Sequence, residues 1–196
     1  MNKENKIVSF KQLDLLFFSI LAIVSEIMSS VLLEQLGSGF YFSFSTVICL
    51  IAMIRWGAVG AIVGMMGGIP GMLLSDMSFW SGLLFYVAAN AALSVPMLLY
   101  GNRNRDRIVE SHVYLLLYIL LSHVCLSVGK GIVIFIVTGE ITGIVDHFGA
   151  TFFILVINII VCLVLRMRKG LICDMRYYFV EEEEEEEGEG NEEGRD

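Results

Sequence analysis

The feature that most constrains this chain is a series of apolar segments, nearly all of them long enough to cross a lipid bilayer. A helix rises 1.5 Å per residue, so about 20 apolar residues span the hydrocarbon layer. Hydropathy predicts six segments, whose bounds are Leu13–Leu36, Tyr41–Ile54, Trp56–Leu74, Trp80–Tyr100, Val113–Val137 and Phe148–Leu165. Since 56% of the 196 residues are hydrophobic, we expect an all-α integral membrane protein rather than a water-soluble domain.

The basic residues fall on one side of this six-segment arrangement. They precede the first segment, lie between the second and third and between the fourth and fifth, and follow the sixth: Lys3, Lys6, Lys11, Arg55, Arg103, Arg105, Arg107, Arg166, Arg168, Lys169 and Arg176. The other three connections contain no Lys or Arg. Because cytoplasmic loops are rich in Lys and Arg, the sequence predicts a six-transmembrane-helix bundle with both termini cytoplasmic.

The third segment is unusually rich in glycine. Small residues four apart form a flat groove that lets a neighbouring helix approach closely within the lipid. Gly60, Gly64 and Gly68 have this spacing and are predicted to pack helices together. A phosphate-binding loop would need a GxGxxG or GxxxxGK[ST] motif, and neither occurs here.

The first segment carries a weaker stripe of small residues, Ser19, Ala22, Ser25 and Ser29. Such a stripe either docks a helix of a partner protein or makes ordinary contacts inside the bundle. Both interpretations remain open at this point.

Ionisable residues inside a membrane are costly and generally mark a functional site or a paired structural charge. Glu26 lies near the middle of the first segment, and Lys130 lies in the fifth, about 10 Å from its outer end at 1.5 Å per residue. The two either pair with each other, or Lys130 faces a cavity open to the outside and meets an anionic or carbonyl group of a ligand.

Further polar residues recur at helical spacing on the last three segments and favour a lined cavity. The candidate substrate-binding residues are Lys130, Ser127, His123, Asn90, Tyr86 and Asn158, with Glu34 near the outer surface. The same residues would also suit hydrogen bonds between helices.

Catalytic and metal-binding motifs are missing from the sequence. There is no HExxH, GxSG-type or Walker motif, and the four cysteines lack CxxC spacing. Ser122 and His123 are adjacent on a helix, so their side chains point in different directions and cannot act as nucleophile and base. We therefore predict a protein that is not an enzyme, needs no cofactor or metal, and does not bind nucleic acid.

The chain resembles the substrate-binding (S) component of an energy-coupling factor (ECF) transporter. The resemblance covers residues 10–170 and is carried by the size, the six segments and the stretch "RWGAVGAIVGMMGG". It implies a protein of the bacterial plasma membrane that captures a vitamin or related micronutrient at the outer face. It also implies association with a membrane scaffold protein and two ABC-type ATPases, an energising module for import.

Two regions depart from the family pattern. The family's AxxxA motif in the first segment, which contacts the scaffold, is represented only by Ser19, Ala22, Ser25 and Ser29. The segment "FYFSFSTVICL" replaces the Asp-containing stretch of riboflavin-binding members, which argues against riboflavin. The alternative function is a structural scaffold protein of the cell-envelope machinery, similar in size to the rod-shape MreD-type proteins.

The sequence divides into a membrane domain, residues 1–170, and a cytoplasmic region, residues 171–196. Residues 181–196 hold eleven acidic residues and one Arg. Because like charges repel one another, this poly-Glu tail is predicted to be disordered. The net charge of −8 therefore describes the tail and not the membrane domain.

Overall fold

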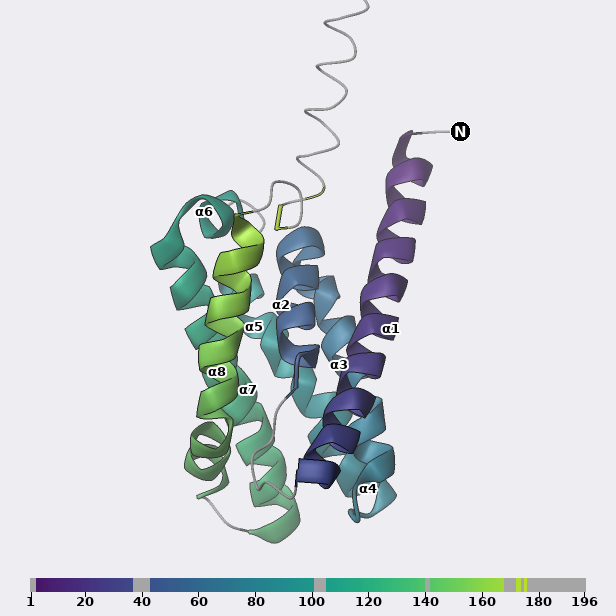
Figure 1. Cartoon of the computed structure of the whole chain (residues 1–196), viewed down its shortest axis with the longest axis vertical. Coiled ribbons are helices and arrows are strands. Elements are labelled where there is room, and N and C mark those ends of the chain that lie inside the picture. The colour runs from purple at the N-terminus through teal and green to yellow at the C-terminus, as the bar shows by residue number, and fades with distance from the viewer. Residues whose placement is uncertain are drawn as a thin grey trace, which may run out of the picture.

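The structure is a computed structural model that describes residues 3–36, 43–100, 105–139, 142–167, 172–173 and 175. The side chains of residues 3–6, 32–36 and 106 lie outside this description, as does the predicted poly-Glu tail. Every secondary-structure element in the described ranges is a helix, and the helices form a bundle (Figure 1).

The long helices are α1 (Lys3–Leu36), α2 (Ser45–Trp56), α3 (Ala61–Leu74), α7 (His112–Thr138) and α8 (Gly143–Arg166). Between α3 and α7 the chain forms α4 (Phe79–Gly82), η2 (Leu83–Val87), η3 (Ala88–Leu93), α5 (Ser94–Tyr100) and α6 (Arg105–Glu110). A short 3₁₀ turn, η1 (Gly57–Gly60), joins α2 to α3. The sequence did not predict α6 as a separate helix.

Five helical segments are long and apolar enough to cross a membrane: Ile7–Val31, Ser45–Leu74, Phe79–Tyr100, His112–Thr138 and Gly143–Arg166. Large apolar side chains are exposed on their outer faces, for example Phe17, Leu99 and Val164. A surface of this kind suits lipid rather than water. The prediction of an all-helical fold is therefore confirmed, and by length and composition the five segments suit the predicted multi-pass membrane protein.

The segment Ser45–Leu74 folds back on itself as a helical hairpin. Gly57 adopts a φ of 74°, which a residue with a side chain rarely tolerates, and so permits the reversal. A Cβ at Gly60 would lie 2.5 Å from the backbone of Ala52, and one at Gly64 would lie 2.8 Å from Cys49 Sγ. These contacts mean that α2 and α3 run antiparallel in close backbone contact.

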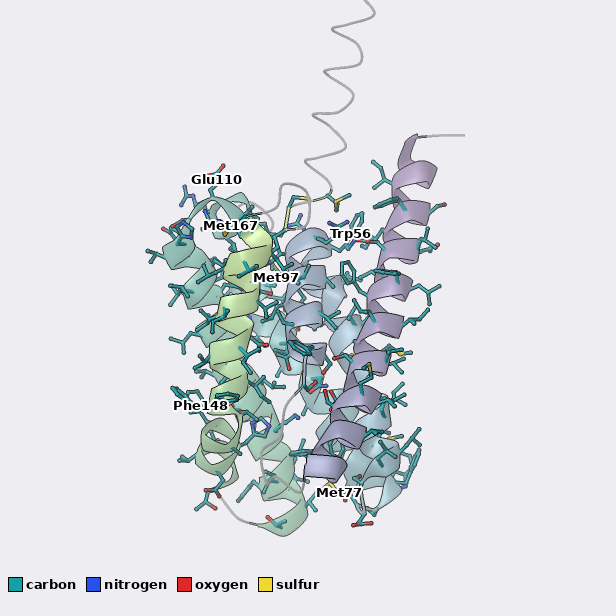
Figure 2. The ribbon with its side chains drawn as sticks, viewed as in Figure 1. Trp56, Met77, Met97, Glu110, Phe148 and Met167 are labelled. Atoms are coloured by element: carbon teal, nitrogen blue, oxygen red, sulfur yellow. The ribbon has the colours of Figure 1, made fainter. Side chains whose placement is uncertain are left out.

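The two ends of the bundle differ in composition. Trp56, Glu110 and Met167 lie at the end where α1 begins and α8 ends, and Met77 lies at the opposite end (Figure 2). The first of these ends also holds Arg55 and Arg166. We refer to it as the basic end.

The fourth segment, Phe79–Tyr100, is not the uninterrupted helix that hydropathy predicts. It contains a π turn at η2 and a 3₁₀ stretch at η3. Pro96 lies just beyond and lacks the N–H that a regular helix would donate to the fourth residue before it. Asn90, inside η3, donates its side-chain N–H to the carbonyl oxygen of Gly64 at 2.7 Å. Irregular helix of this kind is frequent at functional sites.

Candidate functional site: a polar cavity inside the bundle

A small cavity lies inside the bundle, lined by side chains of α1, α2, α3, the irregular fourth segment, α7 and α8. Its volume is about 30 Å³, enough for about two water molecules. It is nearer the end opposite the basic end, because Lys130 lies eight residues before the end of α7 and His147 four residues after the start of α8. It brings together polar groups that are far apart in the sequence.

Lys130 supplies the positive charge of the cavity. Its side chain is buried, with 8% of the residue exposed. The ammonium lies 4.8 Å from the centroid of the Phe85 ring and 5.8 Å from that of Tyr86, which are cation–π distances. Within the described residues no hydrogen bond or ion pair reaches this ammonium. A buried cation held mainly by aromatic rings is well placed to meet an acceptor on a ligand.

Glu26 supplies the negative charge on the α1 side of the cavity, and 5% of the residue is exposed. Its Oε2 accepts hydrogen bonds from the hydroxyls of Ser43 and of Ser45, the latter at 2.9 Å. Ser43 Oγ also accepts the backbone N–H of Ser45 at 3.0 Å. The carboxylate is thus held at the N-terminus of α2, where the helix dipole favours negative charge.

Two histidines connect α7 and α8 beside Lys130. Thr151 Oγ1 lies 3.2 Å from His123 Nε2 and donates to the carbonyl oxygen of His147 at 2.7 Å. Ser127 Oγ lies 3.3 Å from His147 Nδ1. These four residues form a hydrogen-bonded cluster, and three of them (His123, His147 and Thr151) line the cavity.

Tyr86 and Asn90 form the part of the cavity wall that the fourth segment supplies. The backbone carbonyl of Tyr86 packs against Gly68 so closely that a Cβ at Gly68 would overlap its oxygen. The predicted packing glycines therefore sit in tight contacts: Gly60 and Gly64 against α2, and Gly68 against the fourth segment. The close contact of Gly68 with the Tyr86 carbonyl and the hydrogen bond from Asn90 to Gly64 hold the side chains of Tyr86 and Asn90 at the cavity.

Four of the predicted substrate-binding residues line the cavity: Lys130, His123, Tyr86 and Asn90. Ser127, which was also predicted, lies within hydrogen-bond distance of His147, another residue of the lining. Asn158 is buried on α8 but does not line the cavity, and the side chain of Glu34 lies outside the described residues. Glu26 and Lys130, for which pairing and ligand binding were open alternatives, line the same cavity.

The small-residue stripe of α1 is divided between two environments. Ser19 and Ala22 are buried, with Ala22 Cβ 3.1 Å from the position of a Cβ on Gly67. Ser25 and Ser29 line an apolar groove of about 710 Å³ between α1, α2 and α8. Contact within the bundle accounts for the first pair, and docking of a partner remains a prediction for the second.

Sequence reasoning missed several cavity residues. Glu26 was considered only as an ionisable group, and His147 only as part of a polar loop. Ser43 and Ser45, which bond to Glu26, were not candidates either, although they share the local sequence "SFS". His147 and Thr151 have an i, i+4 spacing that places them on one helix face, so this spacing was the available signal.

The lining of the cavity combines charged and polar groups that can bind a polar ligand. A cation on α7 and a carboxylate on α1 face one space, with hydroxyl, imidazole and amide groups between them. The described residues contain no group of three or more His, Cys, Asp or Glu that would hold a metal ion.

Comparison of the chain with protein-family models, curated proteins and solved structures finds no match.

Proposed function

We propose that this protein binds a small polar solute in the Lys130 cavity as the substrate-binding component of an ECF-type importer in a bacterial plasma membrane. The single observation that carries the proposal is the buried Lys130 ammonium, which faces a polar cavity and contacts the rings of Phe85 and Tyr86. A stable bundle has no need of such a charge, because burying it is costly. A ligand with an anionic or carbonyl group compensates that cost.

The proposed topology has six crossings with both termini cytoplasmic. The hairpin α2–α3 contributes two of them, since its arms run antiparallel. The basic end then lies in the cytoplasm, in agreement with the preference of Lys and Arg for that side. On this orientation the cavity is in the outer half of the membrane, where a solute arrives.

A vitamin or related micronutrient is larger than 30 Å³, so binding requires the cavity walls to move apart. The irregular fourth segment is the wall best suited to this movement, because π and 3₁₀ turns are held by weaker hydrogen-bond patterns than an α-helix. Tyr86 and Asn90 lie on that wall. Transport energy would come from a separate scaffold protein and two ATPases, docked in part along the groove that Ser25 and Ser29 line.

The test is a ligand screen on the purified protein in detergent, read as thermal stability. Vitamins, nucleobases and queuine-like compounds form the panel, and copurified small molecules are identified by mass spectrometry. A ligand at 100-fold excess over its Kd stabilises the native state by about 2.7 kcal/mol. Absence of any shift across the panel and of any copurified solute would favour the scaffold function.

Lys130→Met then tests the site itself. Methionine keeps the side-chain length and removes the charge, so ligand-dependent stabilisation should disappear while the ligand-free protein remains folded. Ile136→Met, on the exposed face of the same helix, is the matched control and should bind as the wild type does. Equal affinity in Lys130→Met would remove Lys130 from the site.

A further inference from the structure

The charges in the lining of the cavity sum to zero. Among the lining residues that the structure describes, Lys130 and Glu26 are the two whose side chains are fully charged at neutral pH. The lining also holds His123 and His147, and histidine is mostly uncharged at that pH. One positive charge on α7 and one negative charge on α1 therefore face the same space.

The two charges are held separately. The Lys130 ammonium lies beside the rings of Phe85 and Tyr86, and no ion pair reaches it from the described part of the chain. Glu26 accepts hydrogen bonds from the hydroxyls of Ser43 and Ser45, where α2 begins. A buried ion pair that serves stability alone needs direct contact with good geometry. Separate positions instead suit two groups that each meet a different part of one ligand.

This arrangement restricts the charge of the ligand. A ligand with a single positive or negative charge compensates one of the two side chains and leaves the cavity with a net charge, which is costly at membrane depth. An uncharged polar ligand adds no net charge, but its dipoles compensate each buried ion less well than an opposite charge does. A zwitterion compensates both ions and leaves the cavity neutral.

We propose that the solute of this cavity is a zwitterion, with its carboxylate at Lys130 and its ammonium at Glu26. The lysine supplies three N–H donors and the glutamate accepts only, so the donors and acceptors of the two poles also match. The inference rests on the proposed function, because it concerns the same cavity, and it adds the chemical class of the substrate.

Matched sets of compounds test the class on the purified full-length protein in detergent at neutral pH. Each set holds an amino acid, the amine that lacks its carboxylate and the acid that lacks its ammonium, for example phenylalanine, phenethylamine and 3-phenylpropanoate. Nucleobases serve as uncharged probes, and melting temperature against concentration gives the Kd of each compound. At least one amino acid should stabilise the protein, and its amine and its acid should each bind at least about tenfold more weakly.

Three results would overturn the class. They are tightest binding by an amine or an acid, tightest binding by a nucleobase, and binding of a singly charged vitamin in the absence of binding by any amino acid. Each of these would leave the proposed import function in place. If no compound of these sets or of the vitamin panel binds, the proposed function fails as well.

Two variants should reverse the preference in opposite directions. Lys130→Met leaves Glu26 as the one charge of the described lining, so the amine should bind more tightly than its amino acid. Glu26→Gln leaves Lys130 alone, and the acid should then bind more tightly than its amino acid. Asp76→Asn, which changes an exposed carboxylate beyond α3 in the same way, should keep the wild-type order.

The wild-type order in either folded variant would contradict the assignment of the poles. Glu26→Gln keeps an oxygen that accepts from Ser43 and Ser45, which favours folding. If it nevertheless does not fold, Lys130→Met and the wild-type order decide.

Discussion

Asp14 on α1 and Arg55 on α2 form an ion pair at the basic end, with 2.9 Å between Asp14 Oδ2 and Arg55 Nε. The same carboxylate oxygen accepts the indole N–H of Trp56 at 2.6 Å. Both side chains of the pair are largely buried, at 13% and 10% exposure. The pair joins residues 41 positions apart and holds the turn of the α2–α3 hairpin against α1.

Replacing Asp14 should therefore destabilise the bundle. Asp14→Leu leaves the Arg55 guanidinium buried without this carboxylate, and loss of one partner of a buried pair costs about 3 kcal/mol. The melting temperature in detergent should fall, whereas Gln12→Leu on the exposed side of α1 should change it little. The double variant Asp14→Leu/Arg55→Leu should recover part of the loss. Equal stability of Asp14→Leu and wild type would mean that the pair contributes nothing.

Gly68 and Gly149 offer a matched pair of glycine-to-alanine substitutions. A Cβ at Gly68 would overlap the Tyr86 carbonyl oxygen, while one at Gly149 meets nothing within 4 Å. Gly68→Ala should cost about 2 kcal/mol or more through forced separation of α3 from the fourth segment. Gly149→Ala should be neutral or slightly stabilising. Thermal unfolding of the two variants measures the difference in their stability. Similar melting temperatures would show that α3 and the fourth segment can separate at little cost.

Ser45→Ala tests the hydrogen bonds that hold Glu26. The hydroxyl donates to the carboxylate at 2.9 Å, and a bond to a charged acceptor contributes about 1.5–3 kcal/mol. The control is Ser30→Ala, whose hydroxyl donates to the Ile27 carbonyl of its own helix; its removal should change the stability by less than about 0.5 kcal/mol. In thermal unfolding, we expect a loss of stability for Ser45→Ala and none for Ser30→Ala. If both serines are dispensable, the carboxylate does not depend on Ser45.

Single cysteines test the orientation in the membrane. In a background without Cys49, Cys125, Cys162 and Cys173, Glu110→Cys at the basic end should react with a membrane-impermeant maleimide only after the cells are opened. Met77→Cys, at the other end (Figure 2), should react in intact cells. Labelling of both sites from outside would be incompatible with six crossings and cytoplasmic termini.

Much of the fold was predictable because lipid imposes a simple rule on backbone. Every N–H and C=O must be satisfied within the segment, so long apolar runs become helices. The reversal at Gly57 was also visible, since "RWG" interrupts an apolar stretch that is too long for one crossing. The boundaries were less accurate: α2 continues through Trp56, two residues past the predicted end.

The details of the site were less accessible to sequence reasoning. The π and 3₁₀ turns around Tyr86 and Asn90 arise from contacts with α3, in particular the bond to Gly64. Hydropathy contains no information on such contacts. Helical spacing did place His123, Ser127 and Lys130 on one face. The bonds of Ser43 and Ser45 to Glu26 join the start of α2 to α1, and spacing within one segment does not reveal such contacts.

The shortness of α2 has a consequence for the interior of the bundle. Twelve residues rise about 18 Å, against a hydrocarbon thickness of about 30 Å. Ser45 and Thr46, where this helix begins, border the cavity. The cavity thus lies beside the N-terminal end of a helix that is shorter than the hydrocarbon layer is thick. An extra turn at the start of α2 would add side chains beside the cavity, so we expect the short helix to be needed for an interior that admits a polar solute.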